Sequence, residues 1–145
     1  MQFEQRGSTT PTSEALRGLK VLLIEDMLDA RALFSRMIRR AGGEVEAAAS
    51  AEEAWQLLPG YDPDVIVSDI GLPDEDGCAF MRRFREHEES RGTHTPAVAV
   101  TAFTHYFDRV RQAGFDGYLS KPTTRSALIE SIIDAMAASA AYVRS

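Results

Sequence analysis

The sequence predicts an α/β fold in which five parallel strands alternate with five helices. Four short apolar runs each lead into a polar or charged residue, and they are Lys20–Ile24, Asp64–Ser68, Ala97–Val100 and Gly117–Ser120. Continuous Val, Ile and Leu runs of this length are typical of strands that are buried on both faces of a parallel sheet. Helical patterns separate the runs, and crossovers of this kind are almost always right-handed, so helices are expected on both faces.

The segment after the first run has the pattern of an amphipathic helix. Its apolar residues recur at i, i+3 and i+4 spacing and are Ala30, Leu33, Phe34, Met37, Ile38 and Ala41. Gly42–Gly43 is expected to end this helix, and Glu44–Ala48 is predicted to be a weak second strand. Ser50 is predicted to cap a short helix over Ala51–Leu58, which Pro59–Gly60 is expected to end.

The second half of the chain continues the alternation. A loop over Ile70–Gly77 follows the third strand and leads into a helix whose apolar face carries Phe80, Met81 and Phe84. The charged end of that helix, Arg85–Arg91, is expected to be solvated. A short helix over Tyr106–Ala113, closed by Gly114, and a last helix over Thr124–Ala140 complete the pattern.

Length, charge and composition bound the class of protein. The 145 residues suit one domain, with residues 1–18 as a flexible tail or linker, 19–140 as the folded domain and 141–145 as a C-terminal tail. The net charge of −6 argues against direct nucleic-acid binding and against binding to anionic membranes. No apolar run approaches the roughly 18–20 residues of a membrane span. Cys78 is the only cysteine, which excludes an intrachain disulfide, and a cytoplasmic location is expected.

Chemically active side chains follow several of the predicted strands. Glu25 and Asp26 come after the first, Asp69 after the third, Thr101 after the fourth and Lys121 after the fifth. Because ligand sites of open α/β sheets form beyond the carboxyl ends of the strands, these side chains are expected to share one edge. Clustered carboxylates favour a hard divalent cation, and Mg²⁺ also leaves water positions open for a phosphate. The pattern therefore predicts a cation and phosphate site that contains a nucleophile.

The ordered motifs resemble the receiver domain of two-component response regulators, from about Leu19 to Ala140. The segments that carry the resemblance are Val21–Asp26, Ser68–Gly77, Ala99–Ala102 and Ala113–Pro122. The acidic pair is Glu-Asp where Asp-Asp is commoner in the family, a variant that should preserve metal binding. The resemblance implies a flavodoxin-like, doubly wound (βα)5 fold with strand order 2-1-3-4-5.

The resemblance also implies a role for each residue of the site. Asp69 would be the phosphoacceptor, and Asp26 and Asp69 would ligate Mg²⁺ directly together with the backbone carbonyl of Gly71. Glu25 would act through a metal-bound water. Lys121 would bind the phosphoryl oxygens. Independently of the resemblance, a proline at position 122 predicts a fixed turn after Lys121, and its peptide bond can be cis or trans.

Further roles implied by the resemblance concern switching and signalling. Thr101 would follow the new phosphate by a hydrogen bond, and Tyr118 matches the switch aromatic. Gly71 and Phe103 lie at the two positions where family members tune hydrolysis of the acyl phosphate. The expected partners are a sensor histidine kinase or histidine phosphotransfer protein and a downstream protein target. The expected enzymatic activity is limited to phosphorylation and dephosphorylation of the chain itself, and a homodimer through the fourth and fifth helices is a further expectation.

The residues leave three classes of function open. The favoured class is a phosphorylatable switch. The second class is a pseudo-receiver that works without phosphorylation, but the intact acidic residues, Thr101 and Lys121 argue against it. The third is a Mg²⁺-dependent phosphohydrolase with an aspartyl nucleophile, but Gly71 stands where that class usually has a second carboxylate. The sequence fits a stand-alone regulator and the receiver of a hybrid sensor kinase equally well.

Overall fold

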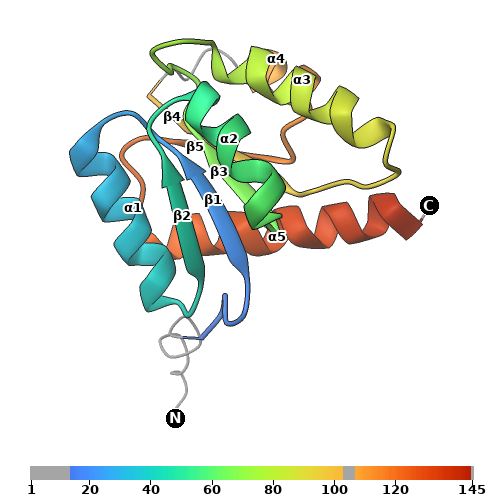
Figure 1. Ribbon diagram of the computed structural model, residues 1–145. Helices are drawn as coiled ribbons and strands as arrows, with labels where there is room; N and C mark the ends of the chain where they lie inside the picture. Colours follow the sequence, from blue (N-terminus) through green and yellow to red (C-terminus); the bar gives the residue numbers. More distant parts are fainter. Residues whose placement is uncertain (1–13, 103–106, 145) are drawn as a thin grey trace.

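A five-stranded parallel sheet in the order β2-β1-β3-β4-β5 forms the centre of the molecule, as predicted (Figure 1). The computed structural model describes residues 14–102 and 107–144. The strands are β1 (Lys20–Ile24), β2 (Glu44–Ala48), β3 (Val65–Ser68), β4 (Ala97–Thr101) and β5 (Gly117–Ser120). The helices are α1 (Leu28–Arg40), α2 (Ala51–Tyr61), α3 (Gly77–Glu89), α4 (Phe107–Ala113) and α5 (Arg125–Arg144).

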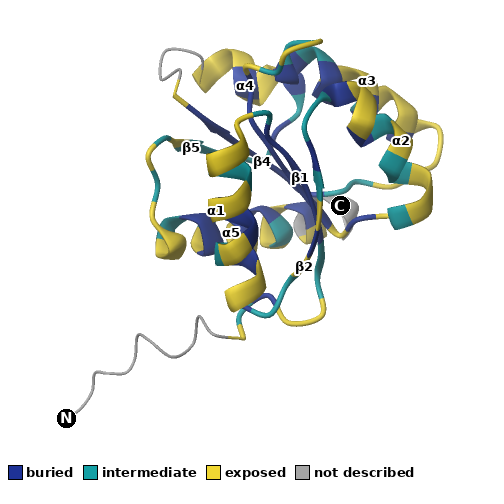
Figure 2. Cartoon of the chain, turned by 60° about the vertical axis from the view of Figure 1, so that its left-hand side comes forward, coloured by how far each residue is buried: buried dark blue, intermediate teal, exposed yellow. Residues whose placement is uncertain are grey.

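The sheet is buried on both faces, which explains why its strands are continuous apolar runs. Successive side chains of a strand point to opposite faces, so Val21 and Leu23 pack with α1 and α5, whereas Leu22 and Ile24 pack with α2, α3 and α4. Each face has its own core, and the dark-blue buried residues of Figure 2 line the sheet and the inner sides of the helices. The helices therefore lie on both faces, as the right-handed crossovers predict.

Helix α2 begins where the sequence predicts and ends later. The Ser50 hydroxyl accepts a hydrogen bond from the backbone N–H of Glu53 at 3.1 Å, which confirms the predicted N-cap. The predicted end at Pro59–Gly60 is wrong, because the helix continues to Tyr61 and Asp62 closes it in the left-handed conformation, with φ 52°. Proline lacks one N–H, so it removes a single hydrogen bond in the last turns of the helix, which the following residues then complete.

The two ends of the domain extend beyond the predicted boundaries. Leu16 belongs to the predicted tail, but its side chain is fully buried and its N–H donates to the carbonyl of Ala41 at 2.8 Å. The packed part of the chain therefore starts before Leu19. Helix α5 continues to Arg144, through most of the predicted C-terminal tail. Residues 1–13 of the predicted tail lie outside the described residues.

The charged end of α3 is partly buried, so the prediction of a solvated face is wrong for Arg85 and Glu88. The guanidinium of Arg85 contacts the carboxylates of Glu88 at 2.6 Å and Asp116 at 3.0 Å, and Glu88 is only 4 % exposed. His94 lies 3.0 Å from the other oxygen of Asp116. Helical periodicity turns these two α3 residues inward beside Phe84, and the ion pairs compensate the burial of their charges.

Candidate site at the carboxyl edge of the sheet

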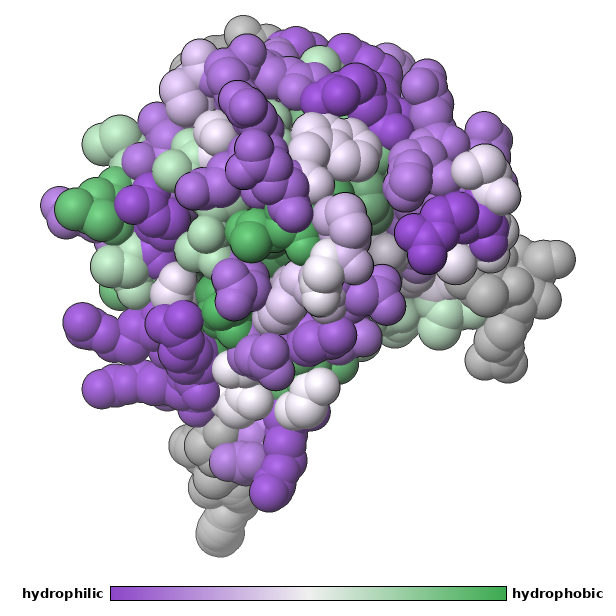
Figure 3. Space-filling model, in the orientation of Figure 1, coloured by the Kyte–Doolittle hydropathy of each residue, from purple (hydrophilic) through white to green (hydrophobic). Residues whose placement is uncertain are grey.

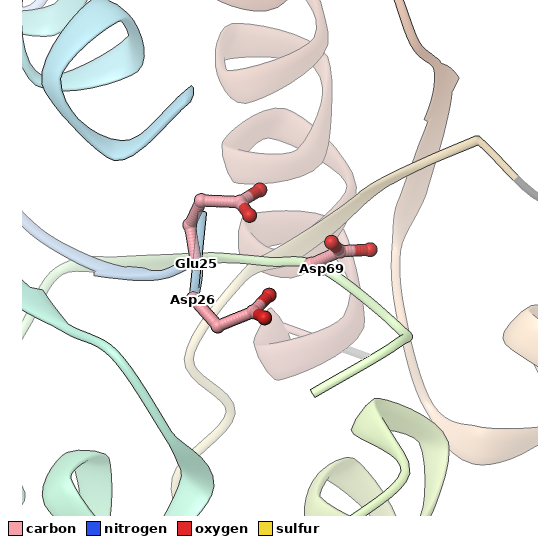
Figure 4. Close-up of side chains that lie close together, drawn as sticks. All are labelled: Glu25, Asp26 and Asp69. Atoms are coloured by element: carbon pink, nitrogen blue, oxygen red, sulfur yellow. The ribbon is translucent and has the colours of Figure 1, made fainter. Parts of the chain in front are cut away.

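Three carboxylates meet where the two central strands end. Glu25 and Asp26 follow β1 and Asp69 follows the neighbouring β3, and each residue offers an oxygen within 4.8 Å of the others. Figure 4 shows that the three side chains lie close together. Glu25 is 1 % exposed and Asp69 is 9 % exposed. Burial and mutual repulsion make this cluster costly unless positive charge compensates it.

Lys121 supplies part of that compensation. Its ammonium donates hydrogen bonds to Glu25 Oε1 at 2.7 Å and to Asp69 Oδ2 at 3.1 Å, from a position just after β5. Burial alone would lower the pKa of Lys121, but the hydrogen bonds and attraction from Glu25 and Asp69 outweigh it and raise the pKa above its ordinary value. The Lys121–Pro122 peptide bond is cis, the isomer that the sequence left open.

Backbone N–H groups hold the carboxylates in position. Asp69 Oδ1 accepts hydrogen bonds from the N–H of Ile70 at 2.6 Å and of Gly71 at 3.3 Å. Glu25 Oε2 accepts one from Met27 at 3.0 Å. Glu25 and Asp69 thus each have one oxygen fixed by the chain that follows it and the other directed at Lys121. This arrangement orients the carboxylates before any ligand arrives.

The donor set fits a hard divalent cation. Three carboxylates carry three negative charges and Lys121 carries one positive charge, which leaves the cluster at −2. All the clustered donors are oxygens, which Mg²⁺ prefers over the nitrogen and sulfur ligands of transition metals. Both oxygens of Glu25 already have partners, whereas Asp26 is only partly buried. Among the described residues, this is the group that meets the geometric requirements for holding a metal ion.

Two acidic residues that the sequence analysis did not single out hold the loop after Asp69. Asp74 accepts hydrogen bonds from the first N–H groups of α2, at 3.1 Å from Ala51 and 3.0 Å from Glu52. Asp76 caps α3 through the N–H of Cys78 at 2.7 Å and also pairs with Arg109 of α4. The loop is therefore tied to three helices. An aspartate just before a helix is a recognisable N-cap signal, but its contact with a distant helix is not.

Gly77 permits the loop to close against the end of β3. A Cβ atom at this position would lie 2.3 Å from the backbone oxygen of Asp69 and 2.8 Å from Cα of Ile70. Both neighbours are backbone atoms, so they could not move aside without shifting the segment that carries Asp69. Glycine is thus required here by a close approach of two chain segments.

The predicted switch residues lie on β4 and β5. Thr101 ends β4 with its side chain fully buried, and its carbonyl accepts the N–H of Lys121 at 2.8 Å. Tyr118 of β5 is half-buried, and its ring meets Phe107 of α4 edge-on at 5.6 Å between centroids. The structure therefore brings Thr101 to the edge that carries Lys121 and places Tyr118 against α4. Phe103 lies outside the described residues.

Among the residues that the structure describes, no helix has both the length and the apolar character to cross a bilayer.

Comparison with known proteins relates the chain to one family. The model of the response regulator receiver domain matches residues 21–133. The chain is 37% identical over 114 residues to the polar-differentiation response regulator DivK of Brucella ovis, covering 77% of this chain and 91% of that protein. It is 37% identical over 106 residues to the transcriptional regulatory protein PhoP of Escherichia coli K12, covering 72% of this chain but only 46% of PhoP.

Solved structures agree with the sequence comparison. The chemotaxis response regulator CheY4 of Vibrio cholerae superposes with a TM-score of 0.74 and 28% identity, over 81% of this chain and 98% of that chain. Receiver domains are phosphoaccepting modules of two-component signalling. The family model spans most of the folded domain and includes the acidic cluster and Lys121. The chain therefore belongs to the response regulator receiver domain family.

Proposed function

We propose that Asp69 accepts a phosphoryl group from a phosphohistidine and that the modified protein signals to a downstream partner. The observation that carries the proposal is the position of the Asp69 carboxylate. It lies at a strand end, oriented by two backbone N–H groups, 3.1 Å from an ammonium and beside two further carboxylates. This is a nucleophile surrounded by groups that can bind a phosphoryl group and a cation.

The transfer needs positioning more than covalent assistance. An oxygen of Asp69 attacks phosphorus in line, a P–O bond forms as the P–N bond to the donor imidazole breaks, and the leaving nitrogen keeps the electron pair. Hydrogen bonds from Ile70 and Gly71 orient the carboxylate. The ammonium of Lys121 donates hydrogen bonds to Glu25 and Asp69 in the free protein. When the phosphoryl group arrives, this ammonium would donate to a phosphoryl oxygen as well.

Mg²⁺ is the proposed cofactor. Following the family pattern, Asp26 and Asp69 would hold the ion together with the carbonyl of Gly71, and Glu25 would act through a metal-bound water. When bound, Mg²⁺ supplies charge neutralisation for the carboxylates and for the transferring phosphoryl group. Lys121 supplies the remaining positive charge at the site.

The proposed switch converts a local charge change into a change of surface. Phosphorylation replaces a carboxylate charge of −1 by roughly −2 at Asp69. Thr101, at the same edge, would bond the new phosphate, and Tyr118 would follow it inward. Tyr118 packs on Phe107 of α4, so its movement would alter the outer face of that helix. Gly71 and Phe103 are proposed to set the rate at which water removes the phosphate.

The partners are proposed from the family and from the surface. The phosphodonor would be a sensor histidine kinase or a histidine phosphotransfer protein, and the signal would pass to a downstream protein in the cytoplasm. Phe107 of α4 and Ile133 of α5 are large hydrophobic residues that are 47% and 43% exposed, which supports a protein contact there. The same surface of α4 and α5 is the proposed interface of a homodimer. The net charge of −6 disfavours direct binding to nucleic acid.

Phosphorylation by a small donor tests the proposal. Phosphoramidate has the P–N bond of phosphohistidine, and intact-mass spectrometry would follow the addition of one phosphoryl group. We expect a hydroxylamine-labile adduct that requires Mg²⁺, is absent with EDTA and is absent in Asp69→Asn. Asp134→Asn, an exposed change on α5, is the matched control and should react normally. Labelling of Asp69→Asn would contradict the proposal, and steady hydrolysis of free phosphate esters would indicate a phosphohydrolase.

A further inference from the structure

The outer side of α1 carries a concentration of positive charge that the phosphoacceptor chemistry does not use. A hollow of about 560 Å³ lies between α1 and the edge of β2, and four arginines line it, Arg31, Arg36, Arg39 and Arg40. Among the described residues, no carboxylate lines this hollow, although the chain as a whole has a net charge of −6. Figure 3 shows hydrophilic side chains projecting over the C-terminal half of α1.

Positive and negative side chains are sorted to opposite faces of the edge strand. Val45 and Ala47 of β2 pack with the core beneath α1, so the alternation of the strand directs Glu44 and Glu46 to the α2 face. Burial, reinforced by the charges of these two glutamates, raises the pKa of Tyr61 in α2 to about 12. Glu44 and Glu46, which flank the β2 residue beside the hollow, therefore lie on the opposite face of the strand from it.

The outer edge of β2 lies beside the same hollow, although Val45 itself is only 7 % exposed. β2 is the outermost strand of the sheet on this side. The N–H of Glu44 bonds Leu19 at 2.8 Å, and the carbonyl of Ala48 accepts from Glu25 at 2.9 Å, so these alternate residues face β1. Val45 and Ala47 consequently direct their backbone groups away from the sheet. Arg39 reaches the carbonyl of Val45 at 3.4 Å, which links the arginine surface to this edge.

We propose that the edge of β2 and the arginines of α1 together bind an extended acidic segment of a partner protein, which adds to the sheet as a sixth strand. Backbone pairing to Val45 and Ala47 would give affinity, and alternate carboxylates would give specificity. The spacing agrees, because Arg36 and Arg40 are about 6 Å apart along the helix axis and alternate residues of a strand are about 6.6 Å apart. Neither arginine forms an ion pair with another described residue.

Arginine is well suited to binding carboxylates, which is more than the solubility of a surface helix requires. Its planar guanidinium binds a carboxylate with two parallel hydrogen bonds, and arginine is enriched in protein interfaces. Arg31 already bonds the carbonyls of Glu25 and Asp26, and Arg39 bonds that of Val45. Arg36 and Arg40 are the two lining arginines left to receive carboxylates, and an acidic segment would relieve the repulsion between these like charges. The proposal does not depend on phosphorylation of Asp69.

Binding of short designed peptides tests the proposal on the intact chain. The probe is a fluorescent peptide of alternating glutamate and valine, measured by anisotropy at low ionic strength. One matched peptide has lysine in place of glutamate, and another has proline in place of every residue between the glutamates and of alternate glutamates, which removes backbone N–H groups from both edges. We expect saturable binding of the glutamate–valine peptide only. Arg36→Gln combined with Arg40→Gln should weaken it about three- to tenfold, and Arg125→Gln, an exposed change outside the hollow, should not.

Two further measurements separate strand addition from simple charge attraction. Hydrogen exchange of the Val45 and Ala47 amides should slow in the complex, and the double reversal Arg36→Glu with Arg40→Glu should bind the lysine peptide instead. Phosphorylation by phosphoramidate checks that each variant folds. Equal binding of the glutamate and lysine peptides, or binding without amide protection, would overturn the proposal. Inorganic triphosphate is the probe for a simple anion site. If triphosphate displaced the peptide, depended equally on Arg36 and Arg40 and left the amides unprotected, that result would also overturn the proposal.

Discussion

Removing the charge of Lys121 should destabilise the protein and make its stability depend on a divalent cation. Lys121→Met keeps most of the apolar stem but leaves Glu25, which is 1 % exposed, without its ionic partner at 2.7 Å. Breaking a buried ion pair typically costs about 3–5 kcal/mol. The Lys121 side chain is 20% exposed, so partial hydration reduces this and we expect a loss of about 2–3 kcal/mol in the free energy of unfolding.

Urea unfolding at neutral pH with EDTA would measure the loss. A double-mutant cycle with Glu25→Gln isolates the interaction, because neutralising the carboxylate removes the reason for the loss. The double variant should therefore be more stable than the sum of the single losses predicts. Mg²⁺ should stabilise Lys121→Met more than the parent, since the loss of the ammonium leaves three negative charges at the site without a positive one. A loss no larger than that of Arg125→Met, or additive single changes, would refute the reasoning.

Three other predictions concern the support of the site and the pH dependence of stability. Gly77→Ala should cost several kcal/mol and impair phosphorylation, because its Cβ would lie 2.3 Å from a backbone oxygen, whereas Gly60→Ala meets nothing within 4 Å. Arg85→Met should cost about 3 kcal/mol in urea unfolding because it leaves Glu88 charged and buried. Tyr61, whose pKa rises from 10.0 to about 12, stays protonated in the folded state after the unfolded state has ionised, so stability should fall between these pH values.

Each of these predictions has a contrary result. Equal stabilities of Gly77→Ala and Gly60→Ala would show that the loop can move away from the end of β3. Arg85→Met should regain stability when combined with Glu88→Gln, and failure to do so would contradict the ion-pair argument. Tyr61→Phe should flatten the alkaline fall in stability, and phenolate absorbance should lose its latest-titrating component. An unchanged alkaline titration in Tyr61→Phe would assign the effect to another group.

The fold was predictable because its strands are buried on both faces. Continuous runs such as Val21–Ile24 have no other simple explanation once helical patterns separate them, and strand ends then fix which side chains share an edge. This rule alone predicts that Glu25, Asp26 and Asp69 lie close together. Their assignment to separate roles came from the family pattern, and those roles remain proposals.

The features that sequence reasoning missed depend on contacts between distant segments. The string of charges after Phe84 is typical of a solvated helix end, yet Arg85 is drawn inward by Asp116, thirty-one positions away in the chain. Leu16 lies in a polar stretch, yet it is fully buried in the core beneath α1 and α5, and its N–H bonds the carbonyl of Ala41. Local sequence patterns contain no information about such partners. Predictions made from these patterns are therefore wrong mainly at the ends of helices and strands and at long-range ion pairs.

The contacts around the phosphoacceptor loop are of the same kind. Asp74 and Asp76 lie in the loop before Gly77 and look like ordinary loop residues. The structure shows that one caps α2 and the other pairs with α4. The loop that carries Asp69 is therefore connected to the helices before any phosphate arrives, a property that needs the assembled fold.

Chemical identification of the modified residue tests the central claim most directly. The protein would be treated with phosphoramidate and Mg²⁺, reduced with borohydride, which converts an aspartyl phosphate to homoserine, and sequenced by mass spectrometry. We predict homoserine at position 69 and unmodified aspartate at position 26. Homoserine at another position, or none despite a folded protein, would contradict the assignment of Asp69 as the phosphoacceptor.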